Sequence, residues 1–441
     1  MALTIREKSV ISLHFWEFFW TSSSLRAARK SCSQTSIIEL RRVRNLQKDM
    51  DMKTLSTFCV AILAASLVTP AAATTQCYVK GDTSQNNPSK PLGGQQNPYG
   101  SLAAVSADTS CDTIVVLHSS VVLDGGITLT NAQNLVGQEG PNGDLPMITN
   151  STAANLGAGV VLARDNELKQ LHIMNTQFSA IFGSFQIAPF DFGGDVTIQN
   201  ILVTGANQSG TFLPALGAAA PSIFLADATG ANIDIKNSEV GDANVTSIGI
   251  YQVAGHGDVR ISNTTVRDQG YLSEEYELSP GIAVVAVENS SLDVAIVDTS
   301  VSNIGSPFVS NSDGLLLLNS GSGAMTVHVD GYRYSNPDQG GYSGTSTGIE
   351  MGFFGSTGGG TFDGVVTNSV IEDAFVAGIQ VLDQNSGGSN SLTAKINDNV
   401  ITGTWFGIQA FTSQSPYSSM FVDISGNIIA TANRFDCDCS E

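Results

Sequence analysis

Three aspartates recur near the ends of predicted strands in the middle of the chain, at Asp258, Asp293 and Asp330. Two arginines, Arg260 and Arg333, lie close to them in the sequence. Carboxylate oxygens are ligands for hard cations such as Ca²⁺, and a guanidinium can bind an anionic group. These side chains are therefore candidates for a catalytic or Ca²⁺ site if they converge in one groove. If they do not converge, they are solvated carboxylates at turns.

These residues lie in an imperfect repeat that runs from about residue 110 toward the C-terminus. Each unit has an apolar strand that begins Gly-Ile or Gly-Val, as at 281–285, and a second strand built around Asn-x-x-Ile or Asn-x-x-Val, as at 261–266. Successive units are roughly 22–30 residues apart, which is the range of solenoid coils. Apolar and polar residues alternate within the strands, and no stretch sustains helical spacing. The pattern predicts a β-solenoid.

The repeat unit resembles a coil of the right-handed parallel β-helix, the pectate-lyase-like fold, over about the last three quarters of the chain. The resemblance implies an all-β fold, a right-handed parallel β-helix solenoid with a short N-terminal capping helix. It also implies that the recurrent Asn residues at the second-strand turn stack on one another inside the fold. The family includes lyases, hydrolases, epimerases, tailspikes and non-enzymatic surface proteins, so the fold does not select among these functions.

The segment 97–108 and the strand 113–117 resemble the opening of that family, where a short amphipathic helix closes the end of the bore. Such a plug is needed because an open end exposes core and unpaired strand edges. Cys77 and Cys111 bracket the expected helix, and we predict a disulfide between them. No role follows from the pattern for Cys437 and Cys439.

The N-terminal region has the anatomy of a secretory signal peptide. Lys53 precedes an apolar run at 58–68, which is too short to span a bilayer, and the small residues of Ala71-Ala72-Ala73 form a cleavage site. We therefore divide the chain into a non-native or removed extension (1–51), a signal peptide (52–73), an N-terminal cap (74–110) and a parallel β-helix (111–441). The predicted mature chain begins at Thr74 and is secreted or displayed at the cell surface, with the periplasm as an alternative.

The chain is acidic, with 40 Asp and Glu against 20 Lys and Arg. Five of these acidic and ten of these basic residues precede Thr74, so the predicted mature chain has a net charge of −25. This charge disfavours nucleic acid and anionic membranes as partners. Polyuronates are also poor partners unless Ca²⁺ bridges them to the protein, because lyases of this family hold uronate carboxylates with Arg, Lys and Ca²⁺. We expect no other cofactor.

One short motif resembles the Asn-Thr-Asp of polygalacturonases, in which the Asp is the general acid. It is 311–314, with Asp313 at the corresponding position. Those enzymes also carry an Asp-Asp pair, which this chain lacks, and then Gly-His-Gly and Arg-Ile-Lys. Here 255–257 and 260–261 match the latter motifs but precede Asp313, in the reverse order. The departures favour a turn residue over a catalytic acid at this position.

Aromatic segments interrupt the repeat and are the candidate ligand-binding surfaces. Tyr271 and Tyr276 lie in an insertion at 269–280, and Tyr332 and Tyr334 lie in a further aromatic segment. Aromatic rings beside carboxylates stack on sugars and hydrogen-bond to them, and loops that leave a solenoid wall often form its binding grooves. The alternative is that these rings pack locally over the wall.

The sequence therefore favours a secreted or cell-surface β-helix protein that contacts polysaccharide, a cell-surface glycan or another surface partner without catalysis. A polysaccharide lyase or glycoside hydrolase of the same fold is the enzyme alternative. An exported adhesin-like passenger is a further alternative. The pattern leaves the oligomeric state open.

Overall fold

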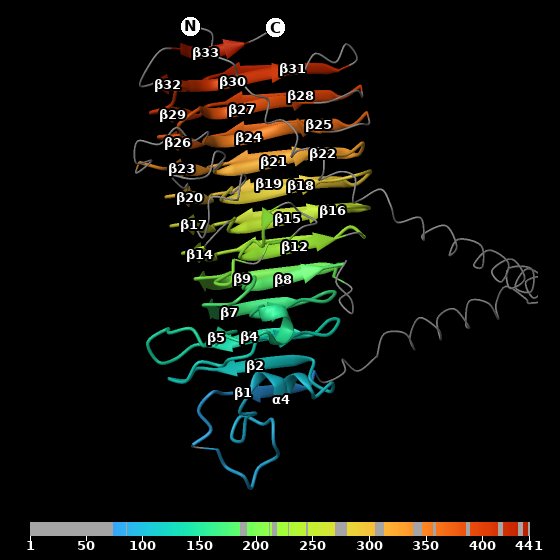
Figure 1. The fold of residues 1–441 in the computed structure, drawn as a ribbon, viewed down its shortest axis with the longest axis vertical. Coiled ribbons are helices and arrows are strands. Elements are labelled where there is room, and N and C mark those ends of the chain that lie inside the picture. The colour runs from blue at the N-terminus through green and yellow to red at the C-terminus, as the bar shows by residue number, and fades with distance from the viewer. Residues whose placement is uncertain are drawn as a thin grey trace, which may run out of the picture. The chain divides into compact units, whose positions relative to one another are not determined.

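The computed structural model describes residues 74–84, 86–185, 192–210, 212–213, 218–227, 229–243, 246–269, 280–304, 313–337, 346–355, 359–384, 389–412, 418–430 and 435–439. Nearly all of them belong to one compact unit, residues 75–213 and 218–441. This unit is an all-β parallel solenoid of about nine turns. Figure 1 shows the strands of successive coils stacked on one another from β1 to β33.

Each complete coil contributes one strand to each of three parallel ladders. The first ladder contains β1 (Gln76–Val79), β2 (Thr113–Leu117), β4 (Asn134–Gln138), β7 (Glu167–Met174), β9 (Asp195–Thr204), β13 (Asn232–Lys236), β16 (His256–Ser262), β19 (Ser291–Val297), β22 (Ala324–Asp330), β25 (Thr361–Thr367), β28 (Ser391–Asn397) and β31 (Ser419–Ser425). The second ladder shares β7 and β9 and adds β5 (Met147–Thr149), β14 (Glu239–Gly241), β17 (Thr265–Arg267), β20 (Ser300–Ser302), β23 (Arg333–Ser335), β26 (Val370–Glu372), β29 (Val400–Thr402) and β32 (Ile428–Ala430).

The third ladder is a separate sheet. It contains β3 (Ile127–Thr128), β6 (Val160–Val161), β8 (Ile181–Ser184), β12 (Ile223–Asp227), β15 (Ile248–Gln252), β18 (Ile282–Ala286), β21 (Leu315–Asn319), β24 (Thr347–Phe354), β27 (Ala377–Gln384), β30 (Phe406–Thr412) and β33 (Phe435–Cys439). Outside the ladders lie the antiparallel pair β10 (Phe212–Leu213) and β11 (Ala218–Ala219), the helix α4 (Leu102–Ser106) and the 3-10 turn η3 (Ala154–Gly157).

Alternation along each first-ladder strand builds the core of the solenoid. In β19, Leu292, Val294 and Ile296 are at most 4% exposed and belong to the hydrophobic core. The residues between them, Asp293 and Ala295, point to the outside. The first ladder therefore buries one apolar face and presents a polar face to solvent, as the period of two predicts.

The third ladder differs because its outer face is also apolar. Leu316, Leu318 and Leu382 form an outer cluster and are at most 7% exposed. Rings of Phe178, Phe182 and Phe224 stack along the same side with centroids 5.2 and 5.4 Å apart. Both faces of this ladder are buried, and the amino-acid sequences of its strands are therefore nearly continuous apolar runs.

The recurrent Asn residues occupy two different positions, which corrects the prediction of one internal Asn ladder. Asn200, Asn237, Asn263 and Asn368 have φ near +50° and lie at turns between the first and second ladders. Asn tolerates this left-handed backbone better than most residues, which explains the repeat.

Inside the solenoid, an Asn stack forms between the last two coils of these ladders. Asn399 is fully buried and donates to the Asn427 side-chain oxygen at 2.9 Å. The equivalent buried position in earlier coils holds a hydroxyl, at Thr264, Thr299 and Ser369. A hydroxyl bonds locally to a backbone carbonyl of its own turn, so a continuous amide stack does not form.

The predicted N-terminal cap is confirmed. Ser101 caps α4 by accepting a hydrogen bond from the Ala104 N–H, and Leu102 and Val105 are fully buried against the end of the bore. The Cys77–Cys111 disulfide joins β1 to the residues that follow α4, with a Cα–Cα distance of 5.6 Å. Among the described residues, none forms a helix that is long and apolar enough to cross a membrane.

Candidate functional site

The outer face of the first ladder carries a stripe of polar side chains that repeats from coil to coil. Four strands share the pattern polar-apolar-x-Ile, beginning at Asp195, Asn232, Asp258 and Asp293, and pair in parallel with these residues in register. The next strand adds Thr326 and His328 in the same two rows. We call the outward residues Asp195, Thr197, Asn232, Asp234, Asp258, Arg260, Asp293, Thr326 and His328 the polar stripe.

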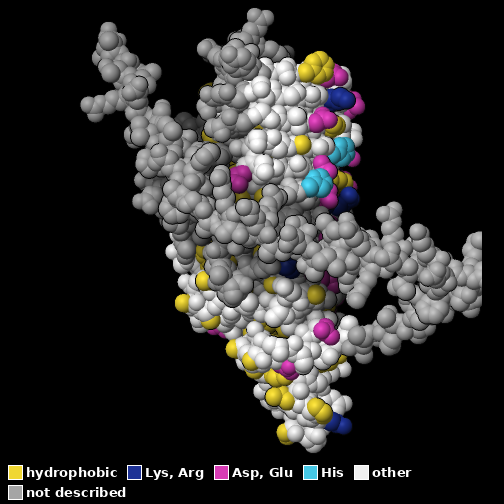
Figure 2. Space-filling model, turned by 90° about the vertical axis from the view of Figure 1, so that its right-hand side faces the viewer, with side chains coloured by type: hydrophobic (Ala, Val, Ile, Leu, Met, Phe, Trp, Pro, Cys, Tyr) yellow, Lys and Arg dark blue, Asp and Glu magenta, His cyan; other side chains and the backbone are white. Residues whose placement is uncertain are grey.

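These residues line an open hollow of about 560 Å³ over five neighbouring strands. Neighbouring parallel strands lie about 4.8 Å apart, so the side chains follow one another at a regular interval along the solenoid axis. Figure 2 shows acidic, basic and histidine side chains gathered in a column along the margin of the described surface. The geometry provides a row of hydrogen-bonding groups rather than a closed cavity.

The hollow is most acidic where Asp258 and Asp293 lie directly opposite each other on β16 and β19. His256 lies beside them, and its Nε2 is 3.7 Å from the Asp293 carboxylate. Each of the three residues can place one ligand atom within 4.8 Å of the others. Of the candidates named from the sequence, Asp258, Arg260 and Asp293 therefore line one hollow, and the two carboxylates lie next to each other.

The three side chains do not match the ligand set of a Ca²⁺ site. Ca²⁺ takes six to eight oxygen ligands, whereas this group offers two carboxylates and an imidazole nitrogen on an exposed face. Imidazole is a ligand for transition metals instead. We therefore derive no chemical step through Ca²⁺ at this position.

Asp330 and Arg333 lie apart from the candidates that line the hollow. Asp330 follows Thr326, the register partner of Asp293, by four residues, which is about 13 Å along the strand. Its carboxylate accepts hydrogen bonds from the Thr367 hydroxyl at 3.0 Å and the Asn368 amide at 2.8 Å. These bonds lower the pKa of Asp330, and the bond from Asn368 has the largest effect. Arg333 lies on β23 in the second ladder, opposite Ser300.

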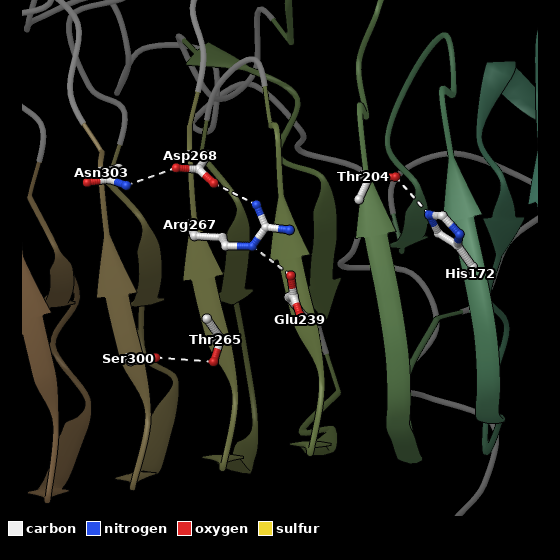
Figure 3. A network of polar contacts seen from close by, with 8 residues as sticks. All are labelled: His172, Thr204, Glu239, Thr265, Arg267, Asp268, Ser300 and Asn303. Atoms are coloured by element: carbon white, nitrogen blue, oxygen red, sulfur yellow. Dashed lines mark hydrogen bonds and ion pairs between the residues drawn. The ribbon is translucent and has the colours of Figure 1, made fainter. Parts of the chain in front are cut away.

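Several basic side chains near the stripe are neutralised by local partners. Lys236 contacts Asp234 at 2.5 Å. Arg267 contacts both Glu239 and Asp268 at 2.6 Å, and Asp268 also accepts from the Asn303 amide at 2.9 Å. Figure 3 shows this network running across neighbouring coils of the second ladder. These charges are engaged within the protein, which leaves few cations to hold an anionic polymer.

Figure 3 also shows His172, whose Nε2 lies 2.8 Å from the Thr204 hydroxyl. Burial lowers the pKa of His172, so the ring is neutral over a wider pH range than an exposed histidine. The contact joins neighbouring strands, β7 and β9, and gives His172 a structural partner.

Asp313 lies just before β21 on the third ladder, away from the stripe. It is 2% exposed and accepts a hydrogen bond from the Thr347 N–H at 3.1 Å. Burial raises its pKa to about 7. Glu350 projects from the outer face of β24. Its pKa is raised well above the usual range, mainly because the side chain is buried and to a smaller extent because of the charge of Asp313. The two carboxyl groups belong to neighbouring coils and influence each other's charge.

Glu350 starts a short polar row on an otherwise apolar face. It pairs in register with Leu316 on one side and Gln380 on the other. Gln380 in turn donates to Gln409 on the next strand at 3.0 Å. Glu350 itself makes no hydrogen bond or ion pair in the part of the chain that the structure describes.

The predicted aromatic contacts are wrong for Tyr332 and Tyr334. Both side chains are at most 1% exposed and belong to the hydrophobic core, so their rings are not accessible to a sugar. They follow the alternation of a short second-ladder strand, which turns them into the bore. Tyr271 and Tyr276 lie outside the described residues.

Sequence reasoning found Asp258, Arg260 and Asp293 but missed the other members of the stripe. The signal was the aligned pattern beginning at Asp195, Asn232, Asp258 and Asp293, with Ile three residues after each. Its intervals range from 26 to 37 residues, because loops of unequal length separate the strands. Local alternation turns these residues outward, but only the register places them side by side.

Comparison with known proteins finds no matching family model and no matching curated protein. Solved structures with a similar backbone course include pectate lyase Pel9A, at 10% identity and a TM-score of 0.40, over 80% of this chain and 81% of that one. The surface protein and adhesin PfbA of Streptococcus pneumoniae aligns at 11% identity and a TM-score of 0.35, over 76% and 93%.

A GH136 lacto-N-biosidase from Eubacterium ramulus aligns at 15% identity and a TM-score of 0.36, over 80% of this chain and 68% of that one. Rhamnogalacturonan lyase aligns at 12% identity and a TM-score of 0.36, over 80% of this chain and 87% of that one. At these identities the similarity is one of fold.

Proposed function

We propose that the protein is an exported β-solenoid that binds polysaccharide along the polar stripe. The supporting observation is the register of carboxylate, amide, hydroxyl and imidazole groups on five adjacent strands over an open hollow. Sugars present hydroxyl groups at regular intervals, and a periodic row of donors and acceptors can hydrogen-bond to several of them at once. An open hollow accommodates an extended chain that passes through it.

The charge of the stripe indicates the class of glycan. Asp195, Asp258 and Asp293 are not paired with a Lys or Arg in the described contacts, and Arg260 is the one basic residue among the lining side chains. A polyuronate would place its carboxylates against these aspartates, where like charges repel. The ligand is therefore a neutral polysaccharide or one that carries amino sugars.

The test is a glycan array followed by calorimetric titration of the best neutral or amino-sugar polymer. Replacing Asp258 and Asp293 together by Ala removes two acceptors from the centre of the hollow. We expect the dissociation constant to rise about 10- to 100-fold, which corresponds to roughly 1.5–3 kcal/mol for charged hydrogen bonds. Addition of EDTA is expected to leave binding unchanged, because the stripe needs no Ca²⁺.

Asp363→Ala is the matched control, because Asp363 lies opposite Thr326 in the same outward row but does not line the hollow. The control should bind like the wild type. Unchanged affinity in the Asp258 and Asp293 variant, or strongest binding to polyuronates, would exclude the stripe as the binding site.

The second candidate function is hydrolysis of a glycosidic bond by Asp313 and Glu350. It is favoured by the raised pKa of both carboxyl groups, because a protonated carboxylic acid near neutral pH can act as a general acid. Glycosidases use two carboxyl groups, one protonated as the general acid and one ionised as the base or nucleophile.

Release of reducing ends from the glycan that the wild type binds would test this activity. Asp313→Asn and Glu350→Gln should each abolish it, while Gln380→Ala, which alters the same polar row without removing a carboxyl group, should retain most of it. If the wild-type protein binds the glycan but releases no reducing ends from it, hydrolysis is excluded and binding is the function.

A further inference from the structure

The hollow over the polar stripe is much longer along the solenoid axis than across it. Its lining side chains come from β9, β13, β16, β19 and β22, which are successive neighbours in the first ladder. At about 4.8 Å per strand, the outermost two of these strands lie roughly 19 Å apart. Along each strand the outward lining residues are two positions apart, which is only about 7 Å. The long dimension therefore follows the column of charged side chains in Figure 2.

The outward row that begins at Thr197 and ends at His328 changes its chemistry at both ends of the hollow. Beyond β9, Glu167 lies opposite Thr197 and is engaged by Lys169 at 2.5 Å. Beyond β22, Val365 lies opposite His328 and has no polar side-chain atom. The row of groups that can serve a ligand is therefore as long as the hollow itself.

The polar groups that have no partner within the protein are spread over several coils of the stripe. At the β9 end, the Asn232 amide donates to the Asp195 carboxylate at 2.7 Å. Further along, Asp258, Arg260 and Thr326 make no side-chain hydrogen bond or ion pair with other described residues. A ligand would therefore find its partners on successive coils rather than at one point.

The hollow offers hydrogen bonds but no surface for stacking. Among the described residues, none of the side chains that line it is aromatic. A sugar residue there is held at its polar edge, and one hydrogen bond changes the affinity by only roughly two- to tenfold. A single sugar residue would consequently bind weakly, and measurable affinity requires several coils to act together.

The spacing of the coils suits a chain laid along the axis. In an extended glycan, each sugar residue advances the chain by nearly the same distance as one coil advances the solenoid. We infer that the polar stripe binds an internal stretch of a linear polysaccharide parallel to the solenoid axis, with one sugar residue over each coil and roughly five in contact. This inference rests on the proposed function and adds the length, direction and linear form of the ligand.

Calorimetric titration of the intact protein with linear oligosaccharides of one to eight residues tests the length. Cello-oligosaccharides are the neutral probe and chitosan oligosaccharides the amino-sugar probe, and fragments of any other polymer that binds on the glycan array are titrated in the same way. In a series that binds, we expect the affinity to rise about two- to tenfold with each added residue and to level off at about five residues.

Two hydroxyl variants distinguish a ligand along the axis from a ligand across it. Thr326 is the register partner of Asp293 on the next coil, along the axis. Ser291 lies two positions before Asp293 on the same strand, across the axis, and does not line the hollow. Thr326→Ala should weaken binding of the pentasaccharide about two- to tenfold, whereas the matched control Ser291→Ala should change it by less than about twofold.

The outcomes separate this inference from the function on which it rests. Equal affinity for the disaccharide and the pentasaccharide, a rise that continues through the octasaccharide, or an effect of Thr326→Ala no larger than that of Ser291→Ala would each overturn the inference and leave polysaccharide binding in place. If no oligosaccharide and no polymer of the array binds, the proposed function is rejected and the inference with it.

Discussion

At the scale of single residues, the same side-chain type serves different purposes in this solenoid. Asp258 is exposed on β16. Asp330 accepts hydrogen bonds from residues of the neighbouring coil, including Asn368 at a turn, and Asp313 is buried and has a raised pKa. Asn368 provides a left-handed turn, while Asn399 is buried and bonded to the next coil. Backbone position and burial decide these differences.

Asn399→Leu tests the buried amide. The Asn399 side chain accepts from the Ser369 N–H at 2.9 Å and donates to the Val366 carbonyl at 3.1 Å. Leucine would leave both backbone groups without a partner, so we expect a loss of about 1–3 kcal/mol in the free energy of unfolding, measured by chemical denaturation. Asn397→Leu is the control, since the Asn397 side chain, within the described part of the chain, accepts a hydrogen bond from the exposed Ser425 hydroxyl and from no other group. Equal stability of the two variants would contradict the structural role.

The raised pKa of Asp313 predicts a pH dependence of stability. The folded chain holds this proton up to about pH 7, whereas the unfolded chain releases it near pH 4. The contribution of this group to the free energy of unfolding should therefore be greatest below pH 4 and fall as the pH rises toward 7, by about 4 kcal/mol, whereas carboxyl groups with a lowered pKa such as Asp330 act in the opposite direction at low pH. Glu350, whose pKa is also raised, acts in the same direction as Asp313.

Asp313→Asn should flatten this dependence, as followed by denaturation at pH 4 and pH 8. Asp363→Asn, at an exposed position, should keep the wild-type slope. A wild-type slope in the Asp313 variant would show that this carboxyl group is not the one responsible.

At the scale of elements, the three ladders have different surroundings. The third ladder is apolar on both faces, and the first ladder is apolar on one face only. This difference explains why the polar stripe lies on the first ladder rather than on the third. At the N-terminal end, α4 supplies the apolar cover that a solenoid end requires.

Cys77→Ser measures the contribution of the disulfide to this cap. The bridge spans a sequence separation of 34 residues. A loop of this length can contribute roughly 3–4 kcal/mol in the chain-entropy model. We expect a lower thermal midpoint than wild type under oxidising conditions, and nearly the same midpoint once the wild type is reduced. The variant Cys77→Ser with Cys111→Ser excludes effects of a lone thiol, and an unchanged oxidised midpoint would rule out a stabilising role for the bridge.

At the scale of the whole molecule, the predicted export remains a prediction that protein chemistry can test. The signal-peptide anatomy from Lys53 to Ala73 predicts that secreted protein begins at or near Thr74. N-terminal peptide mass spectrometry of material from the native source should recover Thr74 as the first residue. Peptides from 1–51 in the secreted protein would contradict it.

The sequence by itself determined the fold class, the N-terminal cap and the Cys77–Cys111 pair. These features rest on local alternation, coil-length repetition and nearby residues, and on their resemblance to a known architecture. The sequence also singled out Asp258 and Asp293 as site candidates, although it placed them near strand ends and the structure places them within β16 and β19. Local patterns could not show that Tyr332 and Tyr334 turn inward, because a three-residue strand is too short to reveal its own alternation.

Only the tertiary structure decided which polar residues share a site. Asp195 and Asp293 are 98 positions apart in the sequence, yet they lie in one row because three successive parallel pairings bring their strands into register. Loops of unequal length between coils hide this register from the sequence. Burial likewise separated Asp313 from the exposed aspartates, because the cost of removing a carboxylate from water depends on neighbours contributed by other coils.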